Sequence, residues 1–151
     1  MTSEWALAIG PGHQRSNADD PIITTAATFG ISVDDVTEYR IAHIRGDLDE
    51  SQVAMIASML LVDPVNGWSK PAAELTHDGE LVIETGLRPG VTDREGAELA
   101  RASAPIGNPL EGATIGRRFV IEASPALTTE QVEQLAHRVL HNDVIERWSR
   151  G

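Results

Sequence analysis

Two stretches of the chain repeat one hydrophobic pattern, in which apolar positions recur every three or four residues. That spacing places the apolar side chains along one face of an α-helix. Asp49 precedes the first stretch and Thr128 the second, and both residue types are favoured as helix N-caps. We therefore predict two amphipathic helices that each bury one face. The apolar positions are Val53, Ile56, Ala57, Leu60 and Leu61 in the first, and Val132, Leu135, Ala136, Val139 and Leu140 in the second.

Apolar runs and turn residues elsewhere predict four strands and two further helices. The segment Gly10-Pro11-Gly12 is expected to break the first strand, because Gly and Pro interrupt regular structure. Asp93 is expected to cap one of the two further helices. The predicted strands cover residues 5–9, 35–45, 80–87 and 118–123, and the predicted helices cover residues 21–29 and 94–103.

The two halves of the chain align with each other. The stretch from Leu48 to Ser69 matches the stretch from Leu127 to Ser149 with one inserted residue near the end. Such self-similarity is typical of a duplicated fold. A short strand is expected to close each half. We predict an α+β protein of two β-α-β-α-β repeats, packed as a pseudo-twofold dimer of small sheets with helices on one face, with repeats at residues 1–69 and 80–151 and a linker at 70–79.

Composition and charge narrow the class of protein. Hydrophobic residues make up 41% of the chain, which is enough for a folded core, and cysteine is absent. The 12 Lys and Arg residues face 23 Asp and Glu residues, so the formal net charge of -11 disfavours nucleic acid and anionic membranes as partners. The first ten residues lack a basic leader, and no apolar run has the length that spans a bilayer. We expect a soluble cytoplasmic protein.

Motifs of catalysis and of cofactor binding are missing from the sequence. Neither the phosphate-binding pattern G-x-x-x-x-G-K-[ST] nor the dinucleotide-binding pattern G-x-G-x-x-G occurs. No serine has the G-x-S-x-G context of a nucleophile. His137 and His141 stand four residues apart, but they fall opposite the apolar stripe of their helix and have no evident third ligand. We expect no catalytic residue, no cofactor and no metal.

Met55 and Met59 distinguish the first amphipathic helix from the second. Both residues lie off the apolar stripe, whereas the matched positions of the second helix are Gln134 and Arg138. The first helix therefore has an additional apolar side. Two interpretations remain open: this side packs against the other half of the chain, or it docks a partner protein, since flexible thioethers suit contact surfaces.

The second half carries a motif that resembles a known family. The segment "LVIETGLRPGVTDREG" contains the turn Pro-Gly-Val-x-Asp-x-x-Gly at Pro89, Gly90, Val91, Asp93 and Gly96, and the last helix leads into the run Asn142-Asp143-Val144-Ile145-Glu146. This combination resembles the PurS family, with Asp143 where proline is usual. The first half keeps only the second motif, as Asp63-Pro64-Val65.

The resemblance implies a place in phosphoribosylformylglycinamidine synthase, an ATP- and glutamine-dependent ligase of purine biosynthesis. PurS subunits are not enzymes by themselves; they dimerise, bridge the synthetase and glutaminase subunits, and support ammonia transfer. The fused repeats resemble the N-terminal domain of the long-chain synthase, and homo-oligomer formation is a further expectation. The candidate partner-interface residues are Pro89, Gly90, Val91, Asp93, Gly96, Met55 and Met59.

The Pro89–Asp93 turn also has a purely structural interpretation. Pro and Gly can end the strand, and Asp93 can cap the next helix, without any contact to a partner. The function has an alternative as well. Small α+β repeats also form free-standing regulatory modules that bind small molecules between paired units. An enzyme in its own right is disfavoured by the missing motifs.

Overall fold

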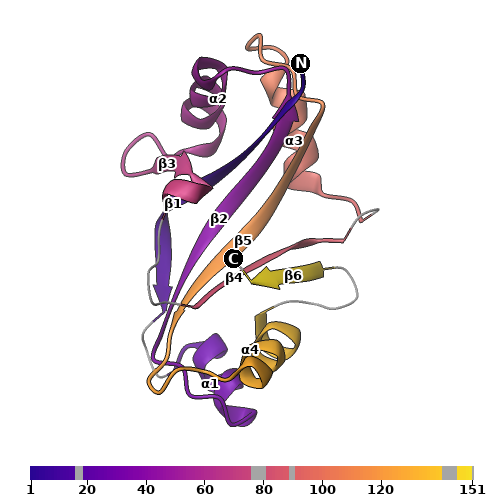
Figure 1. The fold of residues 1–151 in the computed structure, drawn as a ribbon. Helices are drawn as coiled ribbons and strands as arrows, with labels where there is room; N and C mark the ends of the chain where they lie inside the picture. The colour runs from indigo at the N-terminus through magenta and orange to yellow at the C-terminus, as the bar shows by residue number, and fades with distance from the viewer. Residues whose placement is uncertain (16–18, 76–80, 89–90, 141–145, 151) are drawn as a thin grey trace. The chain divides into compact units, whose positions relative to one another are not determined.

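The computed structural model describes residues 1–15, 19–75, 81–88, 91–140 and 146–150, and it shows an α+β fold (Figure 1). The fold class predicted from the sequence is thus confirmed. The described residues form six strands, β1 (Ser3–Arg15), β2 (Asp35–Gly46), β3 (Trp68–Pro71), β4 (Leu81–Leu87), β5 (Gly112–Glu122) and β6 (Glu146–Arg150). They also form four α-helices, α1 (Pro21–Thr28), α2 (Glu50–Ile56), α3 (Arg94–Ser103) and α4 (Thr129–Leu135).

The strands are hydrogen-bonded in the order β3-β1-β2-β5-β4-β6. β1 pairs with β3, and β4 pairs with both β5 and β6, and these three pairs are antiparallel. β2 and β5 come from different halves of the sequence, yet they are neighbours in the sheet. The sequence predicted two small sheets. The strands of both halves are instead hydrogen-bonded in one six-stranded sheet.

Two compact units divide the chain, and neither coincides with a half of the sequence. The first unit holds α2 and β3 from the first half together with α3 from the second half. The second unit holds β4, α4 and β6 from the second half together with α1 from the first half. The first unit comprises Met1–Pro11, Tyr39–Thr76 and Thr92–Gly116. The second unit comprises Gly12–Glu38, His77–Val91 and Arg117–Gly151.

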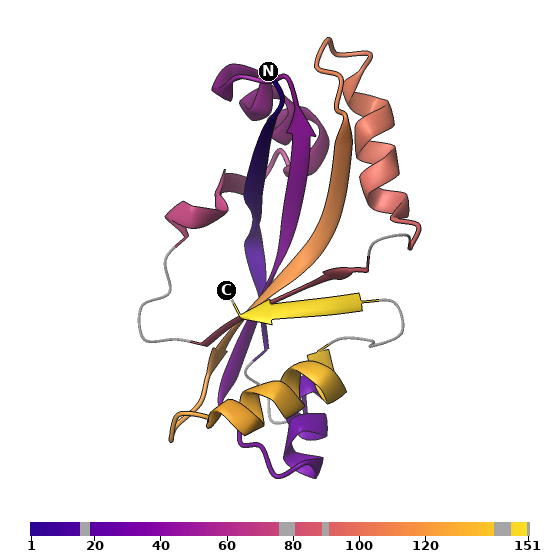
Figure 2. The same ribbon diagram turned by 45° about the vertical axis from the view of Figure 1, so that its right-hand side comes forward.

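The helix that follows the first strand of each half therefore packs with elements of the other half. In the first unit α3 contacts η1, the π-helical turn Ala57–Leu61 that continues α2. In the second unit α1 contacts η3, the π-helical turn Ala136–Leu140 that continues α4. Figures 1 and 2 both show α1 beside α4 in the second unit. The repeats at 1–69 and 80–151 with their linker at 70–79 remain a prediction about the sequence.

Each unit has its own hydrophobic core. In the first unit Leu99 of α3 packs with the buried face of α2 and with strand residues; the core comprises Leu7, Ile9, Ala42, Ile44, Leu48, Val53, Ile56, Ala57 and Leu99. In the second unit Phe119 of β5 is fully buried; the core comprises Ala26, Ile31, Val33, Val36, Ile83, Phe119, Ile121, Val132, Leu135, Ala136 and Leu140. Both apolar stripes predicted from the sequence therefore face a core.

The two aligned helices share their local structure. Asp49 accepts a hydrogen bond from the N–H of Gln52, and the Gln52 side chain accepts one from the N–H of Asp49. Thr128 and Gln131 form the same capping box at the start of α4. The predicted caps are confirmed, and each helix then widens into a five-residue π-helical turn that the sequence pattern did not reveal.

The predicted break at Gly10-Pro11-Gly12 is wrong, because β1 continues through it to Arg15. Gly10 lies opposite Trp68 of β3, and a Cβ at position 10 would overlap the indole ring. Gly10 is therefore present to make room for a side chain and not to end the strand. β5 likewise begins at Gly112, ahead of the predicted start at residue 118.

Candidate partner interface

Asp93 fixes the start of α3 and also attaches it to the sheet. One carboxylate oxygen, Oδ1, accepts a hydrogen bond of 2.8 Å from the N–H of Gly96, and the other, Oδ2, accepts one of 2.9 Å from the N–H of Ile115 in β5. The first bond is the N-cap predicted from the sequence. The second joins two segments that are 22 residues apart, and no local sequence pattern indicates it.

Gly96 lets α3 approach β5 closely. The residue is buried, and a Cβ at this position would overlap the carbonyl oxygen of Ala113 in β5. The Asp and the Gly of the Pro-Gly-Val-x-Asp-x-x-Gly motif thus have structural roles, since they place one helix on one strand. Any contribution of Gly96 to partner binding acts through the position of α3.

The remaining residues of the motif are described in part. Pro89 and Gly90 lie outside the described residues. Val91 is half-buried, and its N–H donates a hydrogen bond of 3.1 Å to the carbonyl oxygen of Arg88. A role of these three residues in docking stays a prediction.

A groove of about 330 Å³ lies in the first unit between η1 and α3. Its apolar walls come from Leu60 and Leu61 of η1, from Leu99 and Ala102 of α3, and from Ile115 of β5. Arg40, Glu95 and Glu98 line the same groove, and the Arg40 guanidinium lies 3.0 Å from the Glu95 carboxylate. With Arg40 paired in this way, Glu98 gives the charged rim an acidic character.

Met55 and Met59 lie on the exposed side of α2 and η1. Their exposed fractions are 45% and 59%. The side-chain nitrogen of Asn108, a buried residue of the second half, lies 3.4 Å from the Met55 sulfur. Met55 thus contacts the second half of the chain, while both methionines keep a large exposed area, and docking of a partner on this side stays a prediction.

Val65 adds a third exposed apolar side chain close in sequence to Met59. It is 92% exposed and stands in a turn in which the Asp63 side chain accepts a hydrogen bond of 2.8 Å from the Val65 N–H. The N–H of Gly67 closes the turn by donating to the Asp63 carbonyl oxygen at 2.9 Å. Asp63-Pro64-Val65 is a motif in the sequence, and an apolar residue beside the turn residues Asp and Pro is the signal that could have indicated exposure of Val65.

The matched helix of the second unit has a different surface. Gln134 and Arg138 occupy the positions of Met55 and Met59, and both are exposed. The Arg138 guanidinium lies over the Phe29 ring at 5.5 Å from its centroid, which is a cation–π contact. The ring of His137 lies 5.9 Å from that of Trp148, and His141 is outside the described residues.

A second groove, of about 460 Å³, lies in the second unit at the start of β4, the end of β5 and the start of α4. Apolar side chains including Leu81, Ile121 and Val132 line it, and its charged residues are Glu122 and Arg150. This groove offers one place for the small-molecule alternative, although that alternative expected a site between paired units.

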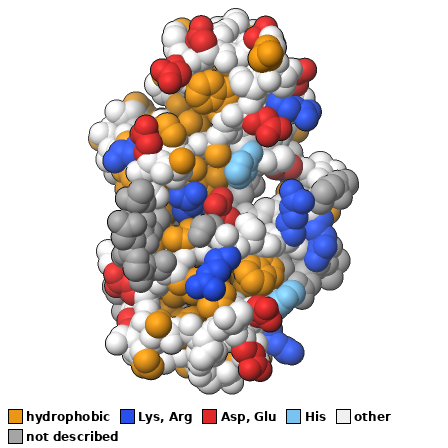
Figure 3. Space-filling model, in the orientation of Figure 1, with side chains coloured by type: hydrophobic (Ala, Val, Ile, Leu, Met, Phe, Trp, Pro, Cys, Tyr) orange, Lys and Arg blue, Asp and Glu red, His pale blue; other side chains and the backbone are white. Residues whose placement is uncertain are grey.

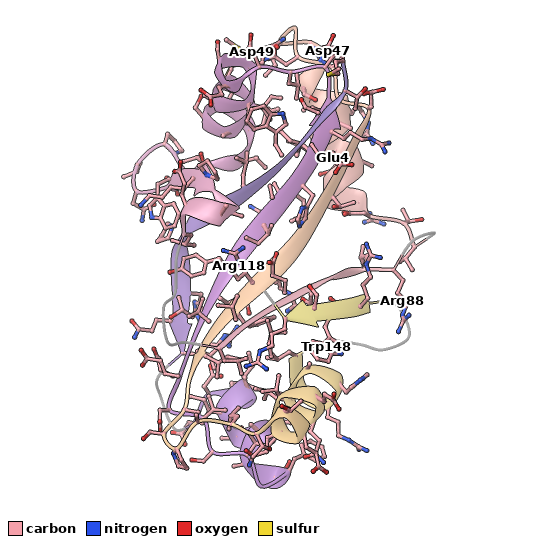
Figure 4. The ribbon with its side chains drawn as sticks, in the orientation of Figure 1. Glu4, Asp47, Asp49, Arg88, Arg118 and Trp148 are labelled. Atoms are coloured by element: carbon pink, nitrogen blue, oxygen red, sulfur yellow. The ribbon has the colours of Figure 1, made fainter. Side chains whose placement is uncertain are left out.

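The two arginines of β5 are engaged in ion pairs. Arg118, which is 8% exposed and is labelled in Figure 4, lies 3.3 Å from Glu84 of β4. Arg117 lies 3.3 Å from Glu146 of β6. Among the described residues, no three His, Asp or Glu side chains gather where they could hold a metal ion, and no described helix is long and apolar enough to cross a membrane.

Comparison with known families agrees with the motifs. The PurS family, described as phosphoribosylformylglycinamidine (FGAM) synthase, matches residues 80–150. The matched segment spans β4, α3, β5, α4 and β6, and it includes Asp93 and Gly96. A comparison with curated proteins finds no match. Residues 80–150 of this chain, slightly less than half of it, are therefore similar to the PurS family.

Proposed function

We propose that the chain is the non-catalytic scaffold of phosphoribosylformylglycinamidine synthase, which bridges the synthetase and glutaminase parts and supports ammonia transfer between them. PurS is a non-catalytic component of this synthase in purine biosynthesis, and the family match carries the proposal. The synthetase and the glutaminase are the specific partners proposed here.

The composition of the first unit supports the proposal. The unit contains Asp93 and Gly96 of the family motif, the groove between η1 and α3, and the exposed side chains Met55 and Met59. A capped helix, an apolar groove and exposed thioethers together make a surface suited to protein contact. The second unit exposes different side chains at the matched helix positions, which suits a protein that meets two different neighbours.

The chain is further proposed to be a fused pair of PurS-like repeats, at residues 1–69 and 80–151. The shared capping boxes and π-helical turns of the aligned helices support this proposal. Fusion makes the association of the two repeats intramolecular, so it no longer depends on protein concentration.

Reconstitution tests the scaffold proposal. The chain would be mixed with purified synthetase and glutaminase proteins of the same organism, and complexes would be resolved by gel filtration. Glutamine-dependent and ammonia-dependent product formation would be measured side by side. We expect a ternary complex only when the chain is present, together with a rise of the glutamine-dependent rate and little change of the ammonia-dependent rate. No complex and no effect on either rate would contradict the scaffold function.

The groove of the second unit favours a second candidate function, a regulatory module that binds a small molecule. Its volume of about 460 Å³ lies within the usual size range of ligand sites. A thermal-shift screen with nucleotides and amino acids tests it. Stabilisation by one compound in the absence of any protein partner, weakened by Ala126→Trp at the exposed wall of the groove, would favour the regulatory function over the scaffold.

A further inference from the structure

We propose that Met55, Met59 and Val65 form a docking surface for a cationic segment of a partner protein that inserts an apolar side chain between lysines or arginines. These three residues are called the methionine surface below. The proposal rests on the proposed function, because it takes the partner to be a protein of the synthase complex, and it adds the place and the chemistry of the contact.

The methionine surface is apolar and held in position. Met55 and Met59 are four residues apart, which places both side chains on the same side of a helix. The Asn108 side-chain nitrogen lies 3.4 Å from the Met55 sulfur, and the hydrogen bond to Asp63 fixes the backbone at Val65, which is 92% exposed. Because the backbone of these elements is already fixed, only the side chains lose conformational entropy when a partner binds.

The charge around the methionine surface is acidic. Between residues 46 and 69 the chain has neither Lys nor Arg, and its acidic residues, called the acidic frame below, are Asp47, Asp49, Glu50 and Asp63. The Asp47 carboxylate lies 3.2 Å from the N-terminal ammonium, so the net charge of the frame comes from Asp49, Glu50 and Asp63. Asp49 and Glu50 stand at the start of α2, and Asp63 follows the end of η1. Figure 4 labels Asp47 and Asp49 near the start of α2, and Figure 3 shows hydrophobic side chains with acidic ones around them where Figure 1 places α2.

Complementary charge therefore selects a cationic partner. An acidic frame attracts lysines and arginines and steers them over roughly one Debye length, about 10 Å at 0.1 M salt. A second copy of this chain is a poor occupant, because each copy carries a formal charge of -11 and would bring acidic frame against acidic frame.

The matched helix of the second unit provides an internal comparison. α4 and η3 keep the capping box and the core stripe of α2 and η1, yet they present Gln134 and Arg138 in place of the two methionines. The fold of this element therefore does not require methionine at either position. The double variant Met55→Gln plus Met59→Arg copies side chains that the same local structure already accepts.

The experiment measures binding of the full chain to purified synthetase and to purified glutaminase separately, by calorimetry at low and high salt. The variants are Met55→Gln plus Met59→Arg, the single change Val65→Ser in the exposed turn, and Glu50→Gln in the acidic frame. Glu130→Gln in the first turn of α4 is the matched control. Circular dichroism and thermal unfolding check that each variant folds.

We expect the double variant to raise the Kd for one of the two partners by at least about tenfold, as truncation of central interface residues does. Val65→Ser should raise the same Kd. Because Val65 is 92% exposed, this variant should fold even if the double variant does not. Glu50→Gln should weaken binding mainly at low salt, because it removes one charge of the frame, while Glu130→Gln should leave the Kd unchanged.

The other outcomes are distinct. Wild-type binding to neither protein would overturn the proposed function. Wild-type binding that both the double variant and Val65→Ser leave unchanged would overturn the methionine surface alone. Dimerisation of the free chain, measured by sedimentation and abolished by the double variant, would overturn the cationic partner in favour of a second copy.

Discussion

The carboxylate of Asp93 accepts a hydrogen bond from the backbone N–H of Ile115 at 2.9 Å while its other oxygen caps α3. One side chain thereby fixes where the helix begins and where it lies on β5. Asp93 thus joins a helix to a strand, and the groove between α3 and η1 depends on that link.

Replacement of Asp93 should separate the two roles. Asp93→Ser keeps a cap acceptor but leaves the Ile115 N–H without its partner, and we expect a loss of about 1 kcal/mol. Asp93→Ala also removes the cap, for a total loss of about 2 kcal/mol. Asp49→Ala, which removes a cap without a link to a strand, is the comparison at about 1 kcal/mol. Urea unfolding measures all three, and equal losses for the two alanine variants would refute the joint.

Gly96→Ala should destabilise the first unit by about 2 kcal/mol, because the new methyl group meets the Ala113 carbonyl oxygen, a backbone atom that cannot move aside alone. Gly86→Ala in β4 is the control, since a Cβ there has no neighbour within 4 Å. We expect the control to be neutral or slightly stabilising. Thermal unfolding of both variants measures the difference, and a neutral Gly96→Ala would show that α3 lies farther from β5.

Separated halves should not fold as monomers. A chain of residues 1–75 lacks α3, whose Leu99 belongs to the core of the first unit, and a chain of residues 81–151 lacks α1, whose Ala26 belongs to the core of the second. We expect each half alone to lack cooperative thermal unfolding as a monomer, and mixing of the two halves to restore it. Circular dichroism with sedimentation analysis measures this. A monomeric half that unfolds cooperatively would contradict the exchange of helices.

Asp20 should make the second unit sensitive to acid. Burial alone would raise the pKa of its carboxyl, but the hydrogen bond from Arg15, the N–H of Ile22 and the charge of Arg15 outweigh burial and lower the pKa below its ordinary value. A carboxyl with a lowered folded-state pKa stabilises the fold above the unfolded-state value of about 4, and this contribution is lost as the pH falls through the folded-state pKa.

The variant Asp20→Asn keeps an N-cap acceptor but cannot ionise. Its deficit in melting temperature relative to the wild type should therefore be largest above about pH 5 and should shrink toward about pH 2. Melting curves across this range measure the deficit. A deficit independent of pH would show that the Arg15–Asp20 ion pair contributes no stability.

The sequence by itself determined the elements that depend on near neighbours. Helix caps at Asp49, Asp93 and Thr128 form within three residues of the cap, so residue type and spacing predicted them. The buried stripes of α2 and α4 followed from helical periodicity for the same reason. The family motif was also readable, because its residues lie within one short segment, Pro89 to Gly96.

Only the tertiary structure decided the features that join distant residues. Gly10 indicates a strand break in the sequence, but it faces Trp68 across the sheet and the strand continues. The bond from Ile115 to Asp93 and the packing of α3 with the first half span many residues, so no local pattern encodes them. Periodicity predicts which face of a helix is apolar. Which other part of the protein that face packs against depends on contacts made after the chain has folded. For that reason the sequence left two interpretations of Met55 and Met59, and the fold shows one side chain in contact with Asn108 and both still exposed.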